Sequence, residues 1–170
     1  MIIRQERPVE LEKIHDFIKT AFKTARVSAG TEQDLVDRLR AGENYIPELA
    51  LVAEENGEMI GYIMLTEAHI SGPTEEFPVL FLAPICVAQE RRNKGLGSQI
   101  IRESFSLAME MGYTAVLLVG DPAYYEKFGF KRASSFGIKT LHNNILDQNA
   151  LACELVPGVL KKASGAADCF

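Results

Sequence analysis

The feature of this sequence that most constrains its fold is a junction between a strand and a helix near the middle of the chain. The apolar run VLFLAPICV (79–87) is typical of a strand that is buried on both faces. The loop RRNKGLGS (91–98) follows it. Apolar residues then recur at helical spacing, at Ile100, Ile101, Phe105, Leu107, Ala108 and Met111. A basic, glycine-rich loop therefore joins a buried strand to an amphipathic helix.

The composition of this loop predicts an anion-binding site. Backbone N–H groups at the start of a helix have no intrahelical partner, and the helix dipole adds partial positive charge there. Gly95 and Gly97 permit tight backbone conformations and the close approach of a bulky anion. Arg91, Arg92 and Lys94 add positive charge around the rim. Together these features indicate a site for a phosphate or a pyrophosphate.

The charge of the whole chain requires that any anion be bound locally. The 170 residues carry a net charge of −5, so no global positive field exists to hold nucleic acid or an anionic membrane. We therefore expect neither nucleic acid nor a membrane as a partner. The length favours a single domain over residues 1–170.

Cysteine usage and the N-terminal sequence favour a cytoplasmic protein. Cys86, Cys153 and Cys169 are widely spaced and form no CxxC pair. This spacing argues against a disulfide framework and against a zinc cluster, so we expect no metal. The N-terminus lacks the hydrophobic region of a signal peptide, and no apolar run approaches transmembrane length.

Helix signals occur at four places. Hydrophobic spacing predicts a helix after Pro8, and Thr31 has the position of the N-cap of a second helix. The helix after the basic loop is expected to end at Gly112, a plausible C-cap glycine. Asp121 as cap and Pro122 as first residue predict a further short helix.

Strand signals alternate with these helices. Asn56-Gly57 predicts a tight turn between two apolar strands. Pro84 lies inside the run 79–87, where it cannot donate to a ladder, so a bulge or a local splay of the sheet is expected. Other strands are predicted at residues 1–5, 114–120, 136–138 and 150–156. The order of elements predicts an α/β mixture on one mostly antiparallel sheet.

Two common phosphate-binding patterns do not match the basic loop. A P-loop requires GxxxxGK[ST], and Gly95 does not begin that pattern. A dinucleotide fold requires GxGxxG at the first βα turn, with an acidic residue about twenty positions later. Here the third glycine is missing and the unit lies far from the N-terminus. The pattern that fits is R-x-x-G-x-G, from Arg92 to Gly97.

A second motif lies downstream in YYEKFGF (124–130), where Tyr125 stands four residues before Gly129-Phe130. With the loop and the order of elements, it resembles the signatures of the GNAT superfamily of acyl-CoA-dependent N-acetyltransferases. The segments GDPAYYEKFGF (120–130) and ALACELVPGVL (150–160) are similar to the YhbS-like bacterial branch. The resemblance implies a GNAT-like sheet of about seven strands flanked by about four helices, splayed at the strand that carries Pro84.

The resemblance also implies acetyl-CoA as co-substrate. The backbone of Ile85, Cys86 and Val87 would pair with the pantetheine arm like an extra strand, in a slot opened by the splay. Tyr125 would lie near the thioester sulfur. The pyrophosphate would be held by the amides of the loop, in the set Arg92, Asn93, Lys94, Gly95, Leu96, Gly97 and Ser98.

Acetyl transfer to an amine needs an acid for the leaving thiolate and a base for the amine proton. Tyr125 suits the role of acid, because an ordinary tyrosine pKa of about 10 keeps it protonated at neutral pH. The base is open. An ordered water is one alternative, and the candidate side chains are Asp121, Glu126, His69, Glu75 and Glu76. For Asp121, the role of helix cap is an equally good explanation.

The sequence therefore predicts an N-acetyltransferase in which a primary amine attacks acetyl-CoA directly and Tyr125 protonates the departing thiolate. The acceptor is a small molecule or a protein amine, and the resemblance admits a homodimer. Two alternatives remain open. One is a CoA-binding sensor or regulatory module without turnover, and the other is a different phosphate-ligand protein such as a nucleotide binder.

Overall fold

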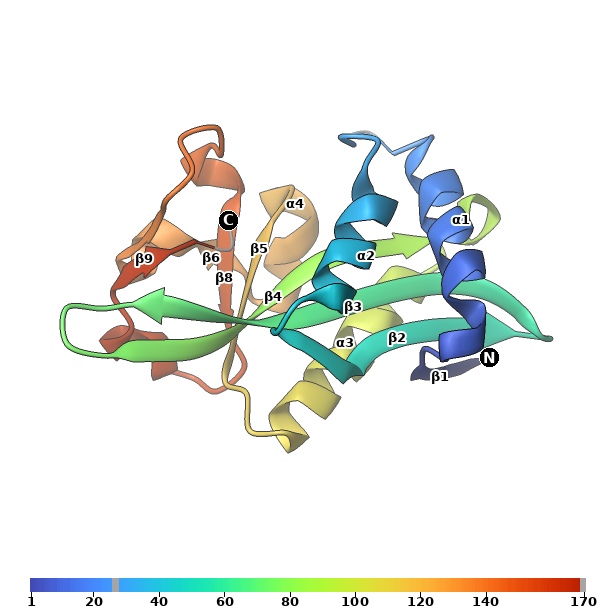
Figure 1. The fold of residues 1–170 in the computed structure, drawn as a ribbon. Coiled ribbons are helices and arrows are strands. Elements are labelled where there is room, and N and C mark those ends of the chain that lie inside the picture. The colour runs from blue at the N-terminus through green and yellow to red at the C-terminus, as the bar shows by residue number, and fades with distance from the viewer. Residues whose placement is uncertain (26–27, 169–170) are drawn as a thin grey trace. The chain divides into compact units, whose positions relative to one another are not determined.

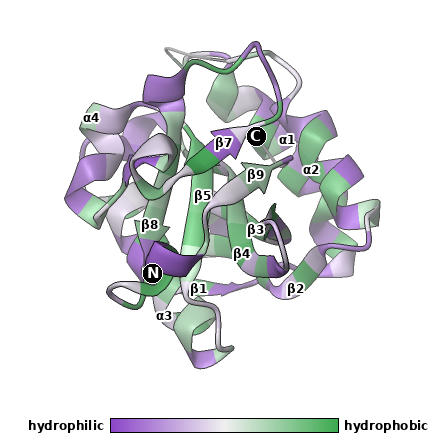
Figure 2. Ribbon diagram, turned by 90° about the vertical axis from the view of Figure 1, so that its left-hand side faces the viewer, coloured by the Kyte–Doolittle hydropathy of each residue, from purple (hydrophilic) through white to green (hydrophobic). Residues whose placement is uncertain are grey.

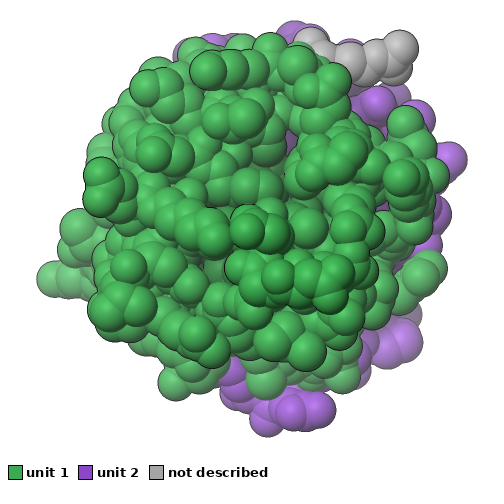
Figure 3. Space-filling view, turned by 90° about the vertical axis from the view of Figure 1, so that its right-hand side faces the viewer, with its two compact units in different colours: residues 1–66, 83–107 green, residues 67–82, 108–170 purple. Residues whose placement is uncertain are grey.

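The computed structural model describes residues 1–25 and 28–168, and it has a mixed α/β fold (Figure 1). The chain forms two compact units, which Figure 3 distinguishes by colour. Unit 1 comprises Met1–Thr66 and Ala83–Leu107, and unit 2 comprises Glu67–Leu82 and Ala108–Phe170. The single domain over residues 1–170 stays a prediction. Cys169 lies outside the described residues.

Four α-helices and nine strands are present in the described part of the chain. The helices are α1 (Leu11–Phe22), α2 (Glu32–Ala41), α3 (Leu96–Glu110) and α4 (Pro122–Tyr125). The strands are β1 (Ile2–Gln5), β2 (Tyr45–Glu55), β3 (Glu58–Ser71), β4 (Glu76–Val87), β5 (Ala115–Val119), β6 (Lys131–Arg132), β7 (Ile138–Thr140), β8 (Ala150–Glu154) and β9 (Gly165–Ala167).

Most strand pairings are antiparallel, as the sequence predicts. The pairs β1–β2, β2–β3, β3–β9, β5–β8 and β6–β8 are antiparallel, whereas β4–β5 and β7–β9 are parallel. The strands number nine rather than about seven, because β6 and β9 were not predicted. They contain two and three residues, and segments this short carry no readable alternation of apolar and polar residues.

Unit 1 contains the predicted hairpin. Asn56 and Gly57 have φ values of 52° and 81°, the left-handed conformations that a two-residue hairpin turn requires. The turn connects β2 to β3, whose register runs from Glu55 opposite Glu58 to Tyr45 opposite Thr66, with irregularities on the way. The turn residues therefore set the alignment of the two longest strands of this unit.

Helices α1 and α2 cover one face of this part of the sheet, and α3 covers the other (Figure 1). On the first face, buried residues from both helices and from the strands form one apolar cluster. It includes Ile14 and Ile18 of α1, Val36 of α2, and Tyr62, Met64 and Cys86 of the strands. On the other face, Gly61 makes room for α3, because a Cβ there would lie 2.5 Å from Cδ1 of Ile100.

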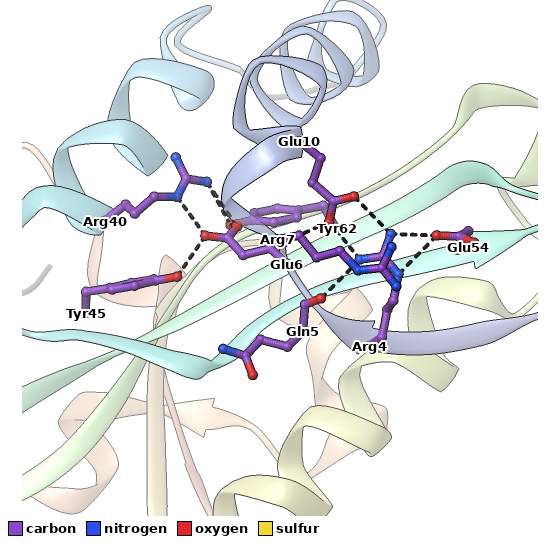
Figure 4. Close-up of polar contacts among 9 residues, drawn as sticks. All are labelled: Arg4, Gln5, Glu6, Arg7, Glu10, Arg40, Tyr45, Glu54 and Tyr62. Atoms are coloured by element: carbon purple, nitrogen blue, oxygen red, sulfur yellow. Dashed lines mark hydrogen bonds and ion pairs between the residues drawn. The ribbon is translucent and has the colours of Figure 1, made fainter.

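A buried carboxylate connects four elements of unit 1 (Figure 4). Glu6, which is 7% exposed, follows β1. Its Oε1 accepts hydrogen bonds from Arg40 Nε at 2.7 Å and from the Tyr45 hydroxyl at 2.8 Å. Its Oε2 accepts from Arg40 Nη2 at 3.0 Å and from the Tyr62 hydroxyl at 2.7 Å. The charge of Glu6 is therefore fully satisfied, as a buried ion must be.

The tyrosines of this cluster stay neutral. Burial, together with the adjacent Glu6 carboxylate, raises the pKa of Tyr45 to about 12 and the pKa of Tyr62 well above its ordinary value. Both hydroxyls therefore remain donors to Glu6 over the physiological pH range. The cluster joins β1 to α2, β2 and β3, and so fixes α2 against the sheet.

Unit 2 is built around β5. This strand pairs in parallel with β4 through Leu80–Val116 and Phe81–Leu117, and antiparallel with β8 over its whole length. Figure 2 shows both β5 and β8 as largely hydrophobic ribbons. Burial of their side chains forms the core of this unit together with residues of the later segments, including Ile138, Leu160 and Ala167.

Most local predictions are confirmed. The strand at the N-terminus, the helix after Pro8 and the strands 114–120 and 150–156 correspond to β1, α1, β5 and β8. Helix α3 is followed by Gly112 at φ 91°, with Gly112 N–H and Tyr113 N–H bound to the carbonyls of Met109 and Ala108. This is the Schellman arrangement that a C-cap glycine makes.

Two local predictions need comment. Thr31 has the N-cap position of α2, but its side chain makes no capping hydrogen bond. The Glu32 carboxylate accepts from the Ala29 N–H at 2.7 Å, so it binds the segment before the helix and does not replace the missing cap of the first turn. Pro84 lies within β4 and follows a cis peptide bond at Ala83, and the splay there stays a prediction.

No helix among the described residues is both long enough and apolar enough to cross a membrane.

Candidate active site

The basic loop forms the start of α3. Asn93 and Gly95 have φ values of 59° and 82°, so the chain turns through two left-handed residues immediately before the helix. Asparagine tolerates this conformation and glycine adopts it without strain. The first hydrogen bond of the helix runs from Gln99 N–H to Gly95 O at 3.0 Å.

This geometry leaves the first amides of α3 available to a ligand. The N–H groups of Leu96, Gly97 and Ser98 precede the first intrahelical donor, so the helix supplies them with no partner. Gly97 lies in this first turn and has no side chain to shield the amides. Together with the helix dipole, the amides have the arrangement that suits an anion, and the use of this terminus as a binding site stays a prediction.

The cations of the loop are placed differently from the sequence-based expectation. Arg91 pairs with Glu55 at the end of β2. Arg92 donates to the Thr24 carbonyl at 3.2 Å and to the Thr24 hydroxyl at 2.9 Å, and also to the carbonyl of Ala21. Lys94 is exposed. Both guanidinium groups thus face protein partners, and Lys94 is the loop cation left facing solvent.

The strand before the loop carries Ile85, Cys86 and Val87. Cys86 is buried in the cluster beneath α1 and α2, and burial raises the pKa of its thiol to about 12. This cysteine is therefore a neutral core residue and not a nucleophile. Ile85 and Val87 are half-buried, and the Ala88 N–H is bound to Ile60 O at 2.9 Å, which fixes the end of the strand.

Tyr125 belongs to unit 2, where its ring packs against three other aromatic rings. Its ring meets those of Tyr124 and Phe130 edge-on, with centroids 4.9 and 5.6 Å away, and the ring of Phe128 at 6.4 Å. Gly120 also packs against the Tyr125 ring, because a Cβ there would lie 2.5 Å from Tyr125 Cε2. Sequence reasoning missed Gly120 and Phe130 as supports of Tyr125.

The hydroxyl of Tyr125 is suited to donating a proton. Burial, and secondarily the charges of neighbouring Tyr124 and Asp121, raise its pKa well above the ordinary value. Within the described part of the chain, no side chain or backbone group forms a hydrogen bond with this hydroxyl. Tyr125 is therefore a protonated phenol whose donor is not engaged by the protein.

Asp121 acts as the cap of α4. Its Oδ1 accepts from the Ala123 N–H at 3.0 Å, and Pro122 is the first helical residue, as predicted. The segment is further fixed by reciprocal contacts of Gly120 and Asn149, with Gly120 N–H bound to Asn149 O at 2.9 Å and Asn149 Nδ2 to Gly120 O at 3.0 Å. The cap role of Asp121 is thus established, and its role as base stays a prediction.

The other base candidates also belong to unit 2, and Glu126 directly follows Tyr125 at the end of α4. Glu75, Glu76 and Glu126 are exposed. His69 is half-buried, with Nε2 3.6 Å from Glu67 Oε1, and the Tyr113 hydroxyl donates to Glu67 Oε2 at 2.7 Å. The His69 pairing joins residues two positions apart on β3, so strand alternation could have revealed it.

Surface pockets and groups of side chains that could hold a metal ion also bear on ligand binding. A surface pocket of about 520 Å³ lies between α1 and α2, lined by Leu11, Glu12, His15, Asp37, Arg40 and Ala41. It contains none of the residues predicted from the sequence for the site. Among residues 1–25 and 28–168, no group of three or more His, Cys, Asp or Glu side chains is arranged to hold a metal ion.

Comparison with known proteins gives a consistent result. The model of the acetyltransferase (GNAT) domain matches residues 3–133. The chain is 32% identical to YhbS of Escherichia coli, an N-acetyltransferase described as uncharacterized, over 140 residues that cover 82% of this chain and 78% of YhbS. It is 33% identical to E. coli YjhQ, likewise an uncharacterized N-acetyltransferase, over 100 residues, which cover 59% and 55% of the two chains.

Solved structures agree. E. coli YhbS in complex with CoA has a TM-score of 0.85 at 27% identity, covering 98% of this chain and 87% of that one. A GNAT acetyltransferase of Brucella melitensis in complex with acetyl-CoA has a TM-score of 0.69 at 35% identity, covering 76% and 82%. From the domain match and these relatives, the chain belongs to the GNAT family of N-acetyltransferases.

Proposed function

We propose that this protein transfers an acetyl group from acetyl-CoA to a primary amine. The observation that carries the proposal is the start of α3, where Asn93 and Gly95 turn the chain and the amides of Leu96, Gly97 and Ser98 have no helical partner. Such a terminus suits a pyrophosphate. The two solved relatives are complexes with CoA and with acetyl-CoA, which makes the same ligand the natural choice here.

The co-substrate would be held by backbone groups more than by side-chain charge. In this proposal the amides of residues 93–98 bind the pyrophosphate, and the backbone of Ile85–Val87 pairs with the pantetheine arm. Arg91 and Arg92 are bound to other groups of the protein, which supports binding by backbone groups. Of the three loop cations, Lys94 is then the one whose charge is available to the pyrophosphate. Arg92 then contributes to the loop by shaping it.

The chemistry proposed is direct attack. The amine nitrogen forms a bond to the thioester carbonyl carbon, the carbon–sulfur bond breaks, and the sulfur takes a proton from the Tyr125 hydroxyl. The raised pKa of Tyr125 keeps the phenol protonated at neutral pH, which an acid in this role requires. The amine proton goes to Asp121 or to a water, and Tyr125 is reprotonated from solvent.

The acceptor is proposed at the level of a chemical class. A net charge of −5 favours a cationic acceptor, and a primary amine, of a small molecule or of a protein, is cationic before it loses its proton. We place the protein in the cytoplasm, as a monomer or a homodimer. The buried free cysteines Cys86 and Cys153 are compatible with a reducing compartment.

Two measurements test the proposal and separate it from its alternatives. Calorimetric titration with CoA, ATP and NAD should give binding to CoA alone, and binding of ATP or NAD without CoA would refute the assignment. Thiol release from acetyl-CoA, followed with a panel of primary amines, should then rise above the amine-free rate. Binding of CoA without turnover on any amine would instead identify a CoA sensor or regulatory module.

A further inference from the structure

The side chain of Arg92 forms hydrogen bonds with the end of α1. Its Nη1 donates to the carbonyl and the hydroxyl of Thr24, and its Nη2 donates to the carbonyl of Ala21. Arg92 and Ala21 are 71 positions apart in the sequence. One planar guanidinium thereby connects the phosphate loop to a helix from the N-terminal part of unit 1.

The partners of Arg92 are those that a helix end offers to a cation. The last carbonyls of α1, which ends at Phe22, lack intrahelical donors, and the helix dipole places partial negative charge there. The two terminal nitrogens of Arg92, its guanidinium fork, donate to one of these carbonyls, that of Ala21, and to Thr24, two residues beyond the helix. A lysine keeps the charge but cannot reproduce two diverging donors.

The segment that Arg92 holds continues toward α2, and its other end is also tied down. The Glu32 carboxylate at the start of α2 accepts from Ser28 Oγ at 2.9 Å and from the Ala29 N–H at 2.7 Å. Gln33 adds a bond from Nε2 to Gly30 O at 3.2 Å. Arg92 therefore anchors the residues that follow α1, and Glu32 and Gln33 anchor residues 28–30 before α2.

The end of α1 and the first turns of α2 share a buried core with the strand that precedes the loop. Ala21, whose carbonyl accepts from Arg92, and Val36 of α2 belong to the same cluster as Cys86, the middle residue of Ile85–Val87. The charges of Arg92 and Glu32 also act on the Cys86 thiol, the first lowering and the second raising its pKa, although burial has the largest effect. The two helices thus pack in one core with the stretch of β4 that the proposed function assigns to the pantetheine arm.

We infer that Arg92 is a positioning residue, which couples occupation of the phosphate loop by CoA to the order of residues 19–25 at the end of α1 and of residues 28–32 before α2. The inference rests on the proposed function for the identity of the ligand. An anion on the amides of Leu96–Ser98 holds the loop, the loop holds the Arg92 backbone, and the Arg92 fork holds the end of α1. Because coupling is reciprocal, anything that orders these two segments also favours CoA binding.

The test compares Arg92→Ala and Arg92→Lys with Lys94→Ala, which removes the exposed cation of the same loop. Hydrogen exchange is measured at residues 19–25 and 28–32 without CoA and at saturating CoA, and calorimetry gives each Kd. In the wild type, CoA should slow exchange in both segments. In Arg92→Ala, exchange at 19–25 should be about fivefold to tenfold faster without ligand, and the protection by CoA should disappear.

The two other variants separate positioning from direct phosphate binding. Arg92→Lys should behave like Arg92→Ala in exchange, because the fork is lost, while its CoA affinity stays within about threefold of the wild type at matched salt. Lys94→Ala should weaken CoA binding and reduce its salt dependence, with full protection at saturating CoA.

Three results would overturn parts of this account in distinguishable ways. If Arg92→Ala lost CoA affinity as strongly as Lys94→Ala, with protection intact, Arg92 would be a phosphate ligand and the inference would fail while the proposed function stood. If Arg92→Lys and the wild type exchanged equally at 19–25 without ligand, the anchor itself would be refuted. If the wild type bound no CoA, the proposed function would fail, and the comparison without ligand would still decide whether the anchor exists.

Discussion

Replacing Gly120 with alanine should displace Tyr125 without altering its chemistry. A Cβ at this position would lie 2.5 Å from Cε2 and 3.0 Å from Cδ2 of the Tyr125 ring, and 3.1 Å from Leu118 Cδ1. Ordinary contact begins at 3.4 Å, so the ring must move by about 0.9 Å. The rings of Tyr124 and Phe130 pack edge-on against Tyr125 and resist a simple slide.

The expected losses of rate and of stability follow from this displacement of the ring. A misplacement of about 1 Å in a reacting group lowers a catalysed rate by roughly 10²-fold. Gly120→Ala should therefore lower kcat for acetyl transfer by about that factor, with a loss of stability of about 1–3 kcal/mol from overpacking. The Kd of CoA, measured by calorimetry, should change little, because the proposed contacts with CoA are made by the backbone of residues 85–87 and 93–98, which the substitution does not alter.

A double mutant tests whether Gly120 acts through Tyr125. Tyr125→Phe alone should lower kcat by about 10²-fold or more and largely spare the KM of acetyl-CoA. If Gly120→Ala acts only by moving the tyrosine, adding it to Tyr125→Phe should cost almost nothing further. A folded Gly120→Ala protein with the wild-type kcat, or fully additive losses in the double mutant, would refute this reasoning.

Three other predictions concern binding, stability and pH. Gly97→Asp should weaken CoA binding in calorimetry, because it places a side chain and a negative charge at the first turn of α3, and an unchanged Kd would remove this turn from the site. Glu6→Gln should lower the free energy of unfolding in urea by about 2–4 kcal/mol, because it leaves the Arg40 charge without its buried partner. Asp37→Asn, at the exposed contact of Arg40, should lower it by about 1 kcal/mol or less, and equal effects of the two substitutions would contradict the account. Because burial raises the pKa of Tyr125, its hydroxyl should keep the proton as the pH rises through about 10. A kcat that already declines as the pH rises toward about 10 in the wild type, but not in Tyr125→Phe, would contradict the raised pKa of this tyrosine.

The parts of the fold that sequence reasoning predicted well are those with local causes. Asn56-Gly57 needs only its own left-handed conformations to set a hairpin, and Asp121 caps α4 through an amide two residues away. The junction of β4, loop and α3 is equally local, because the free amides and the partial positive charge of a helix N-terminus depend only on the helix itself. These features could be predicted before any tertiary contact was known.

The parts that were missed depend on distant residues. Composition alone made Arg91 and Arg92 rim cations, whereas their partners lie 36 and up to 71 positions away, at Glu55 and at the end of α1. Glu6 gave no signal as a buried carboxylate, because its donors come from α2, β2 and β3. No periodicity in a single sequence encodes such pairings.

The candidate site itself was predictable in part. The amides at the start of α3 have no helical partner and the pKa of Tyr125 is raised, and both are compatible with the predicted roles, which stay predictions. The support of Tyr125 by Gly120 and Phe130 was missed, because a glycine at the end of a strand has many explanations. Only the packed ring shows that a methyl group at Gly120 has no room.

The most direct test of the central claim is the transfer of acetyl groups from isotopically labelled acetyl-CoA to primary amines, with products identified by mass spectrometry. The account predicts labelled N-acetyl product with at least one amine, formed by the wild type at a rate that Tyr125→Phe lowers by about 10²-fold. It would be contradicted if the wild type bound acetyl-CoA yet formed no labelled amide above the protein-free rate with any amine, or if Tyr125→Phe formed it as fast as the wild type.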